Sequence, residues 1–349
     1  MLKDRIRPVI CAFMAAVFYA VNTPLSKILL ESVPTAFMAA FLYLGAGTGV
    51  GIMYIFRYKQ EKSNERLGRE DLPYTAGMVL LDILAPILLM LGIRCGSAAN
   101  ASLLGNFEIV ATTMIAYFLF REGVSRKLAA AIGLITLSSI ILSFEGGESM
   151  HFSLGSIYVL LAASCWGLEN NCTRRISEKS SYQIVTIKGL FSGGGSFVIA
   201  SLLGEKLPDL AHILLVMLLG FVAYGLSIFL YVRAQKDLGA ARTSAYYALN
   251  PFIGAFLSFL LLGEALTASY MAALMIMIAG TLLVVMDTVV RHHMHQHTHF
   301  FTHTHDGTTH THTVVHSHHH DHYIFTDQHS HRHSLKELER ECGHSAGRC

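Results

Sequence analysis

Four ionisable residues interrupt long apolar runs of this chain, and their positions point to chemistry inside a membrane. They are Asp82, Glu108, Glu169 and Lys188. An ionisable group within a bilayer is costly, so it typically marks a solute pathway, a proton relay or a buried ion pair. Desolvation favours the protonated form of a carboxyl group, and the sequence near Glu108 offers no obvious cationic partner. We therefore expect Glu108 to exchange protons, which predicts proton-coupled transport.

A purely structural role is the alternative for two of these carboxylates. An ion pair of Lys188 with Asp82 or Glu169 would fix the packing of helices without contacting a solute. Aromatic residues such as Trp166 also have two interpretations. In the functional interpretation they stack on a substrate or hold a cation. In the structural interpretation they are ordinary packing residues.

An internal repeat relates the two halves of the chain. Residues 97–122 match residues 239–264 at a constant shift of 142, and a shift of 147 relates the first spans of the two halves. Two correspondences each join a carboxamide to a carboxylate: Asn22 with Glu169, and Asn250 with Glu108. Exchanged by a two-fold axis in the membrane plane, such positions would meet near the bilayer centre. The residues that we expect to form this substrate or proton pathway are Asn22, Asp82, Glu108, Trp166, Glu169, Lys188 and Asn250.

Long apolar runs must position these residues. The chain is 52% hydrophobic and 14% charged, with a mean hydropathy of +0.46. A membrane helix needs about 20 mostly apolar residues. Ten such runs occur, at residues 8–30, 34–56, 74–94, 98–120, 127–144, 153–173, 183–203, 210–232, 240–262 and 267–290. We predict an all-α membrane protein of ten transmembrane helices in two inverted five-helix repeats, residues 1–145 and 146–290, followed by a tail over 291–349.

Lysine and arginine concentrate in alternate loops, which predicts the orientation. The basic segments lie at residues 3–7, 57–69, 121–127, 174–179 and 233–242, whereas the loops around 31–33, 145–152 and 263–266 contain neither residue. Basic loops face the cytoplasm. Both termini are therefore expected there, in a multi-pass protein of the cell membrane whose partner is the lipid bilayer. The net charge of +2 gives no sign of a nucleic-acid partner, and the oligomeric state stays open.

The tail is rich in histidine, with 17 between residues 292 and 333. Alternate histidines on an extended chain suit bound Zn, Ni, Co or Cu, although the carrier itself requires no cofactor. The expected metal ligands are His293, His295, His297, His299, His316, His318, His320, His322, His329, His331 and His333. With few aliphatic residues, the tail is predicted to be disordered. Three roles remain open: adventitious metal binding, metal sensing or buffering, and pH sensing.

Short motifs recur in the same order in both halves. Residues 19–24 and 165–171 lie in the first span of each half, residues 97–99 and 239–241 precede the fourth spans, and Glu122 and Glu264 close the fourth spans. These motifs resemble the EamA family of the drug/metabolite transporter superfamily. The resemblance covers about residues 8–290 and implies ten spans and export of a small metabolite, amino acid or drug.

Two departures from the family pattern affect the expected substrate. The family often has an arginine in the second span and a proline in the fourth. Here residues 41–43 of the second span are Phe-Leu-Tyr, and Glu108-Ile109 occupies the region of the proline in the fourth span. The second half keeps Lys188 and Pro251. A carboxylate in place of a proline favours cations or protons over anions.

Other classes of function receive less support. A divalent-metal transporter, or a membrane sensor that signals through the tail, is the alternative, but the spans are poor in histidine. An enzyme is not expected, because the chain contains neither HExxH nor GxSxG, and ATP-driven transport is not expected without a Walker A sequence.

Overall fold

The structure is a computed structural model of the 349-residue chain. It describes residues 2–57, 66–121, 123–145, 151–238, 243, 246–305 and 308–323. The chain divides into two compact units, Met1–Asp287 and Thr288–Cys349. We describe each unit by itself.

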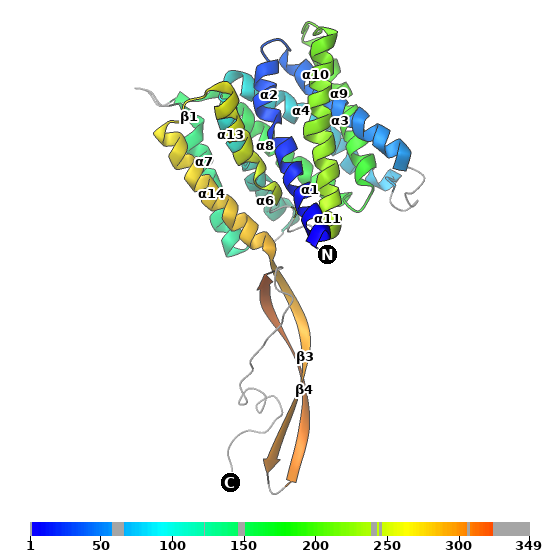
Figure 1. Cartoon of the computed structure of the whole chain (residues 1–349), viewed down its shortest axis with the longest axis vertical. Helices are drawn as coiled ribbons and strands as arrows, with labels where there is room; N and C mark the ends of the chain where they lie inside the picture. The colour runs from blue at the N-terminus through cyan, green and yellow to red at the C-terminus, as the bar shows by residue number, and fades with distance from the viewer. Residues whose placement is uncertain are drawn as a thin grey trace. The chain divides into compact units, whose positions relative to one another are not determined.

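The first unit is built from helices (Figure 1). Its first half contains α1 (Leu2–Ala20), α2 (Asn22–Leu29), α3 (Thr35–Arg57), the 3₁₀ turn η3 (Arg69–Asp71), α4 (Leu72–Cys95), α5 (Ala98–Leu104), α6 (Phe107–Phe120) and α7 (Arg126–Ser143). The second half contains α8 (Leu154–Arg175), α9 (Ser181–Leu202), α10 (Leu210–Gly220), the π-helical turn η4 (Phe221–Leu226), α11 (Ser227–Leu238), α13 (Asn250–Leu262) and α14 (Ala268–Val289). A two-residue strand pair, β1 (Phe144–Glu145) with β2 (His151–Phe152), joins the halves.

Side-chain caps mark where several helices begin. Ser125 accepts a hydrogen bond from the Leu128 amide at the start of α7, and Asp209 accepts one from the His212 amide at the start of α10. Such caps satisfy amides that have no partner within the helix. At Asp209 this bonding holds the carboxyl pKa below its usual range, because the His212 amide and ring stabilise the charged form.

Eight helical segments are long and apolar enough to cross a membrane, by length and composition. They are Arg7–Leu29, Thr35–Arg57, Arg69–Cys95, Ala98–Leu119, Arg126–Ser143, Ser181–Leu202, Leu210–Ala234 and Ala268–Asp287. Two of the ten predicted runs fall short. Helix α8 has sufficient length but carries a polar C-terminal half, and α13 covers only 13 residues of the run 240–262, part of which lies outside the described residues.

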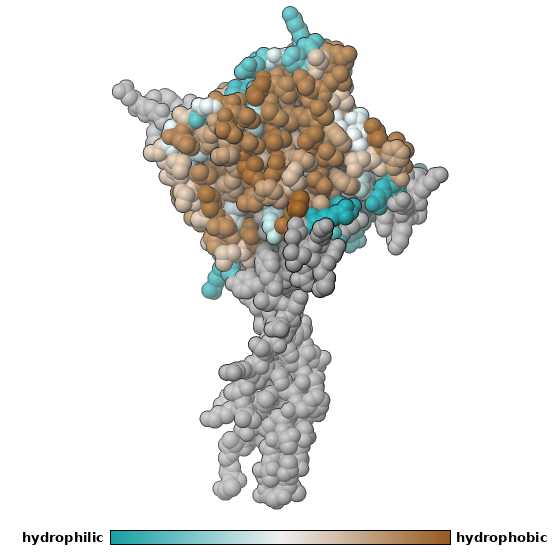
Figure 2. All heavy atoms as spheres, in the orientation of Figure 1, coloured by the Kyte–Doolittle hydropathy of each residue, from teal (hydrophilic) through white to brown (hydrophobic). Residues whose placement is uncertain are grey.

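Helix α8 does not need an apolar surface all round, because one side of it packs against other helices. It packs against α4 and α6, and its buried residues include Trp166, Glu169 and Asn171. Lipid-facing helices show the opposite pattern. Leu202 is 82% exposed and Phe56 is 79% exposed, and hydrophobic residues cover the face of the first unit seen in Figure 2. Exposed apolar surface of this extent is expected against lipid.

Contacts between helices follow the internal repeat. The most extensive contacts in the first unit join α3 with α9, α4 with α8, α1 with α11, and α6 with α8. Exchanging the halves maps the second span onto the seventh, the third onto the eighth, and the first onto the sixth. The α3–α9 pair then maps onto itself, and the α4–α8 pair maps onto the α11–α1 pair. The contacts are therefore those that a two-fold exchange of two repeats requires.

Glycines allow the closest of these contacts. A Cβ atom added to Gly189 in α9 would lie 2.4 Å from the Gly47 Cα atom in α3, and one added to Gly47 would lie 2.6 Å from the Leu190 amide nitrogen. Only glycine permits such an approach of two backbones. Gly194, which the repeat pairs with Gly47 in sequence, has nothing within 4 Å of an added Cβ.

The second unit contains one antiparallel hairpin, β3 (Val290–His305) with β4 (Thr308–Tyr323), where the sequence analysis predicted disorder. The composition argument considered only a hydrophobic core. It overlooked the alternation of Thr, Val and Phe with His, which favours strands, and a hairpin satisfies its backbone by pairing rather than by a core. His329, His331 and His333 lie outside the described residues.

Candidate functional site

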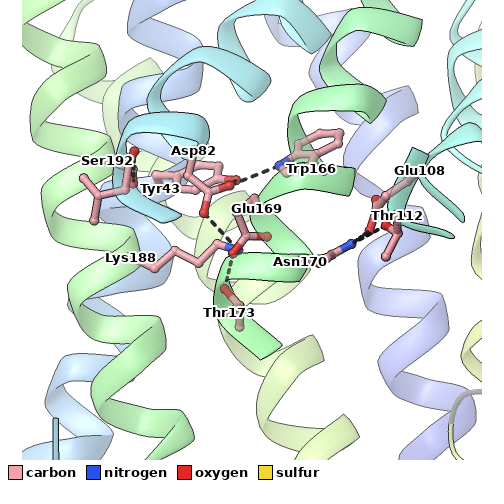
Figure 3. Close-up of polar contacts among 11 residues, drawn as sticks. Tyr43, Asp82, Glu108, Thr112, Trp166, Glu169, Asn170, Thr173, Lys188 and Ser192 are labelled. Carbon is pink, nitrogen blue, oxygen red and sulfur yellow. Dashed lines mark hydrogen bonds and ion pairs between the residues drawn. The ribbon is translucent and has the colours of Figure 1, made fainter. Parts of the chain in front are cut away.

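Two buried carboxylates and one partly buried lysine meet between α4, α8 and α9 (Figure 3). The Lys188 Nζ atom lies 2.9 Å from Asp82 Oδ2 and 3.1 Å from Glu169 Oε1. The side chains of Asp82 and Glu169 are 0% and 2% exposed, and that of Lys188 is 22% exposed. Buried charges of this kind are stable only when they are paired and hydrogen-bonded. One ammonium thus serves two carboxylates, and we call these three residues the charged triad.

Neighbouring donors add hydrogen bonds to both carboxylates. The Tyr43 hydroxyl and the Trp166 Nε1–H each donate to Asp82 Oδ1 at 3.1 Å. The Thr173 hydroxyl donates to Glu169 Oε1 from one turn further along α8. Charge-assisted hydrogen bonds of this type are stronger than those between neutral groups. The triad is consequently held by residues from four helices, with α3 supplying Tyr43.

Glu108 lies beside the triad without joining it. Asn170, the residue after Glu169 on α8, donates from Nδ2 to Glu108 Oε1 at 2.6 Å and to the Thr112 hydroxyl at 3.3 Å. Glu108 is in the first turn of α6. A carboxylate at that position also benefits from the positive end of the helix dipole.

Asn22 approaches the triad from the other side through tyrosine rings. Its Nδ2 donates to the Tyr224 hydroxyl at 3.2 Å, and its Oδ1 accepts from the Ser26 hydroxyl at 3.1 Å. The Tyr224 ring centroid lies 5.5 Å from that of Tyr43, whose hydroxyl bonds Asp82. Tyr224 belongs to the π-helical turn η4, and such turns are frequent at functional sites.

Three predicted polar residues stand immediately after breaks in helices. The chain interrupts its helical pattern at Val21 before Asn22, at residues 105–106 before Glu108, and at residues 248–249 before Asn250. Broken helices of this kind form the solute and ion sites of many secondary transporters. The half-helices α2, α6 and α13 therefore begin at or beside polar side chains.

A narrow crevice of about 10 Å³, roughly the space that one water molecule needs, lies between α3, α9, η4 and α11. Its lining residues are mostly apolar: Val50, Ser181, Tyr182, Val185, Gly225, Ile228, Phe229 and Val232. Lys188 lies three residues after Val185 on α9, and residues at that spacing share one face of a helix. The crevice thus adjoins the helix face that carries the cation of the triad.

Comparison with known proteins assigns this architecture to a family. The profile of the EamA-like transporter family matches residues 6–144 and again residues 153–286. The chain belongs to the EamA-like transporter family. An uncharacterized transporter of Methanothermobacter thermautotrophicus is 27% identical over 291 residues, covering 77% of this chain and 83% of that protein. The uncharacterized transporter YyaM of Bacillus subtilis is 21% identical over 181 residues, which is 49% of this chain and 59% of YyaM.

A solved crystal structure shares the fold. It aligns with a TM-score of 0.59 at 15% identity, over 80% of this chain and 96% of that chain. The chain is thus a multi-pass membrane protein of a transporter family, as its motifs predicted.

Of the seven residues predicted for the pathway of this EamA-like chain, the structure joins four directly. Asp82, Trp166, Glu169 and Lys188 form one bonded network. Glu108 and Asn22 reach its edges through Asn170 and through the Tyr224–Tyr43 pair. Asn250 begins α13, and within the described part of the chain no hydrogen bond or ion pair joins it to the network.

Sequence reasoning did not select Tyr43, Asn170 or Thr173. Asn170 directly follows Glu169, and Thr173 lies four residues after Glu169, one helical turn away. Their position next to a selected residue on the same helix could have identified both. Tyr43 had a weaker signal, because it lies four residues before Gly47 on the face of α3 that meets α9.

A second set of carboxylates ties the two EamA repeats together at helix ends. Glu264, after α13, accepts hydrogen bonds from the Ser97 hydroxyl and from the Ala98 and Ala99 amides at 2.6, 2.7 and 2.9 Å. Glu205 accepts from the Ala36 and Phe37 amides at the start of α3. Each carboxylate of the second half caps a helix of the first. Glu122, the partner of Glu264 in the repeat, lies outside the described residues.

Proposed function

We propose that this EamA-like protein is a secondary carrier that exports a small organic solute, coupled to protons, through the buried polar network. The charge balance of the network supports this proposal. Asp82, Glu169 and Glu108 are three carboxyl groups. Among the residues that the structure describes, Lys188 is the ammonium paired with Asp82 and Glu169, and Glu108 accepts a hydrogen bond from the neutral Asn170. An excess of acidic groups in a low-dielectric site is balanced by a bound proton or by a cationic solute.

Alternating access is the proposed mechanism. The residues of the network come from both halves, so a rocking movement of one half against the other changes their mutual contacts. The hydrogen bonds of Glu264 and Glu205 hold the halves together at helix ends remote from the network. We infer ten spans in two inverted repeats, a location in the cell membrane, and cytoplasmic termini, the last from the distribution of lysine and arginine.

The observation that carries the proposal is the triad of Asp82, Lys188 and Glu169, buried in the membrane unit and shared between halves. The first experiment identifies the solute by untargeted metabolite profiling of cells and medium, with and without the protein. Efflux of each changed metabolite is then measured from proteoliposomes at several imposed pH gradients.

Matched carboxylate variants separate a role in transport from a general effect of removing charge. Asp82→Asn is expected to abolish efflux, and Glu108→Gln to remove its dependence on the pH gradient. Asp209→Asn, at an exposed helix cap, is the control and should transport like the wild type. Unchanged efflux and unchanged pH dependence in well-folded Asp82→Asn and Glu108→Gln proteins would refute the proposal.

A further inference from the structure

The hairpin in the second unit has a register that sorts its histidines. Strands β3 and β4 pair antiparallel from Val290 opposite Tyr323 to His305 opposite Thr308. In an antiparallel pair, residues that lie directly opposite share a face, and successive residues alternate between faces. Odd-numbered positions of β3 therefore share one face with even-numbered positions of β4.

Nearly all histidines of the hairpin fall on that one face. Twelve of the fourteen are placed there: His293, His295, His297, His299, His303, His305, His310, His312, His316, His318, His320 and His322. Only His292 and His319 belong to the other face, whose positions are otherwise rich in threonine. We call the twelve-residue set the histidine face.

Three consecutive rungs of the histidine face are histidine pairs. They are His293 opposite His320, His295 opposite His318, and His297 opposite His316. Directly opposed positions have Cβ atoms about 4.5–5.5 Å apart, and neighbouring rungs are about 6.6 Å apart along a strand. Zinc takes four ligands in a tetrahedron at about 2.0–2.1 Å from imidazole nitrogen. Two adjacent rungs therefore bring together four histidine positions, as many as the ligands that one zinc ion takes.

We propose that these three rungs form a Zn²⁺ site centred on the rung of His295 and His318. That middle rung belongs to both sets of four histidines that adjacent rungs can make. Zinc binding requires neutral imidazoles, and it stabilises the paired hairpin because the rungs exist only when the strands are paired. Without metal, protonation places like charges directly opposite each other, which weakens strand pairing. The proposal is independent of what the membrane unit transports.

Two variants give opposite results for a site set by register and for binding set by composition. Combining His318→Ser with Ser317→His keeps the composition but moves one histidine from the middle rung to the other face. Combining His292→Gln with His319→Gln removes two histidines and leaves every rung intact. Both are made in the full-length protein, purified in detergent with an affinity tag that contains no histidine.

Zinc is the probe, titrated alone by equilibrium dialysis with elemental analysis. Co²⁺ absorption then reports whether the coordination is tetrahedral. The swap at 317 and 318 is expected to weaken the tightest zinc site at least about tenfold and to reduce the tetrahedral cobalt bands. The double variant at 292 and 319 should match the wild type in both measurements. Unchanged binding in the swap, or loss that simply follows the number of histidines, would overturn the proposal.

Discussion

Replacing Lys188 by methionine tests whether the charged triad has the energetics that its burial implies. Methionine keeps most of the volume of the lysine stem but removes the charge that Asp82 and Glu169 share. Both carboxylates are buried, and the ammonium lies 2.9 and 3.1 Å from their oxygens. Tyr43, Trp166 and Thr173 still donate to them, yet no cation then faces them within the bonded network.

The expected loss is large because one partner of a buried ion pair is removed. Such a change costs about 3–5 kcal/mol, since it leaves uncompensated buried charge. Domains of this size lose about 2 °C in Tm per kcal/mol. Lys188→Met should therefore lower the unfolding temperature in detergent by about 6–10 °C, measured by the intrinsic fluorescence of the purified protein.

A fully neutral triad is the matched control. Combining Lys188→Met with Asp82→Asn and Glu169→Gln removes all three charges together, and neutral replacement of a complete buried ion pair costs little. This triple variant should recover most of the lost Tm. The reasoning fails if Lys188→Met is as stable as the wild type, or if the triple variant is no more stable than Lys188→Met.

The same triple variant separates the two roles considered for the triad. A structural ion pair that only fixes helix packing predicts that the stable, neutral protein still transports. The proposed solute or proton pathway predicts a stable protein without transport. Efflux from proteoliposomes distinguishes these outcomes without confusing loss of function with loss of folding.

Three further predictions concern the contacts around the triad and between the halves. Trp166→Phe keeps an aromatic ring but removes a donor to Asp82, so it should cost about 1.5–3 kcal/mol, measured as a loss of Tm. Gly189→Ala should cost about 1–3 kcal/mol by overpacking against α3, whereas Gly194→Ala, with open space at its Cβ, should gain up to about 1 kcal/mol. Glu264→Gln keeps the shape of the cap on α5 but loses its charge, which should cost about 1–3 kcal/mol in unfolding free energy. Equal Tm values for the two glycine variants, or an unaffected Glu264→Gln, would contradict the packing and capping described above.

Much of the fold follows from sequence because the bilayer imposes simple rules. Long apolar runs predicted the membrane helices, and the repeat predicted two related halves, with which the observed helix contacts agree. Helix α8 forms where the run 153–173 predicted a helix, but its C-terminal half is polar and packs in part against α4 and α6, so it is not among the eight segments apolar enough to span a membrane. Apolar runs could not predict the hairpin of β3 and β4, because strand register depends on pairing between residues that are distant in the sequence.

The site was partly predictable for a similar reason. An ionisable residue in an apolar run is conspicuous, so sequence reasoning selected Asp82, Glu169 and Lys188. The structure brings these three side chains together, and their role in transport stays a prediction. Tyr43 was not selected, since a tyrosine within an apolar run is indistinguishable from a packing residue. Its hydrogen bond to Asp82 joins α3 to α4 and depends on how those helices pack.

Comparing the two repeats also reveals an asymmetry in charge: carboxylates in one half correspond to carboxamides in the other. Exchanging the halves pairs Glu108 with Asn250 and Glu169 with Asn22. The two carboxylates are neighbours through Asn170 at the contact of α6 with α8, whereas the two carboxamides lie on α13 and α2, which contact each other on the equivalent side. Equivalent positions in the two repeats therefore carry acidic groups on one side and neutral groups on the other. The proposed coupling to protons therefore predicts one proton site, on the α6–α8 side, instead of two.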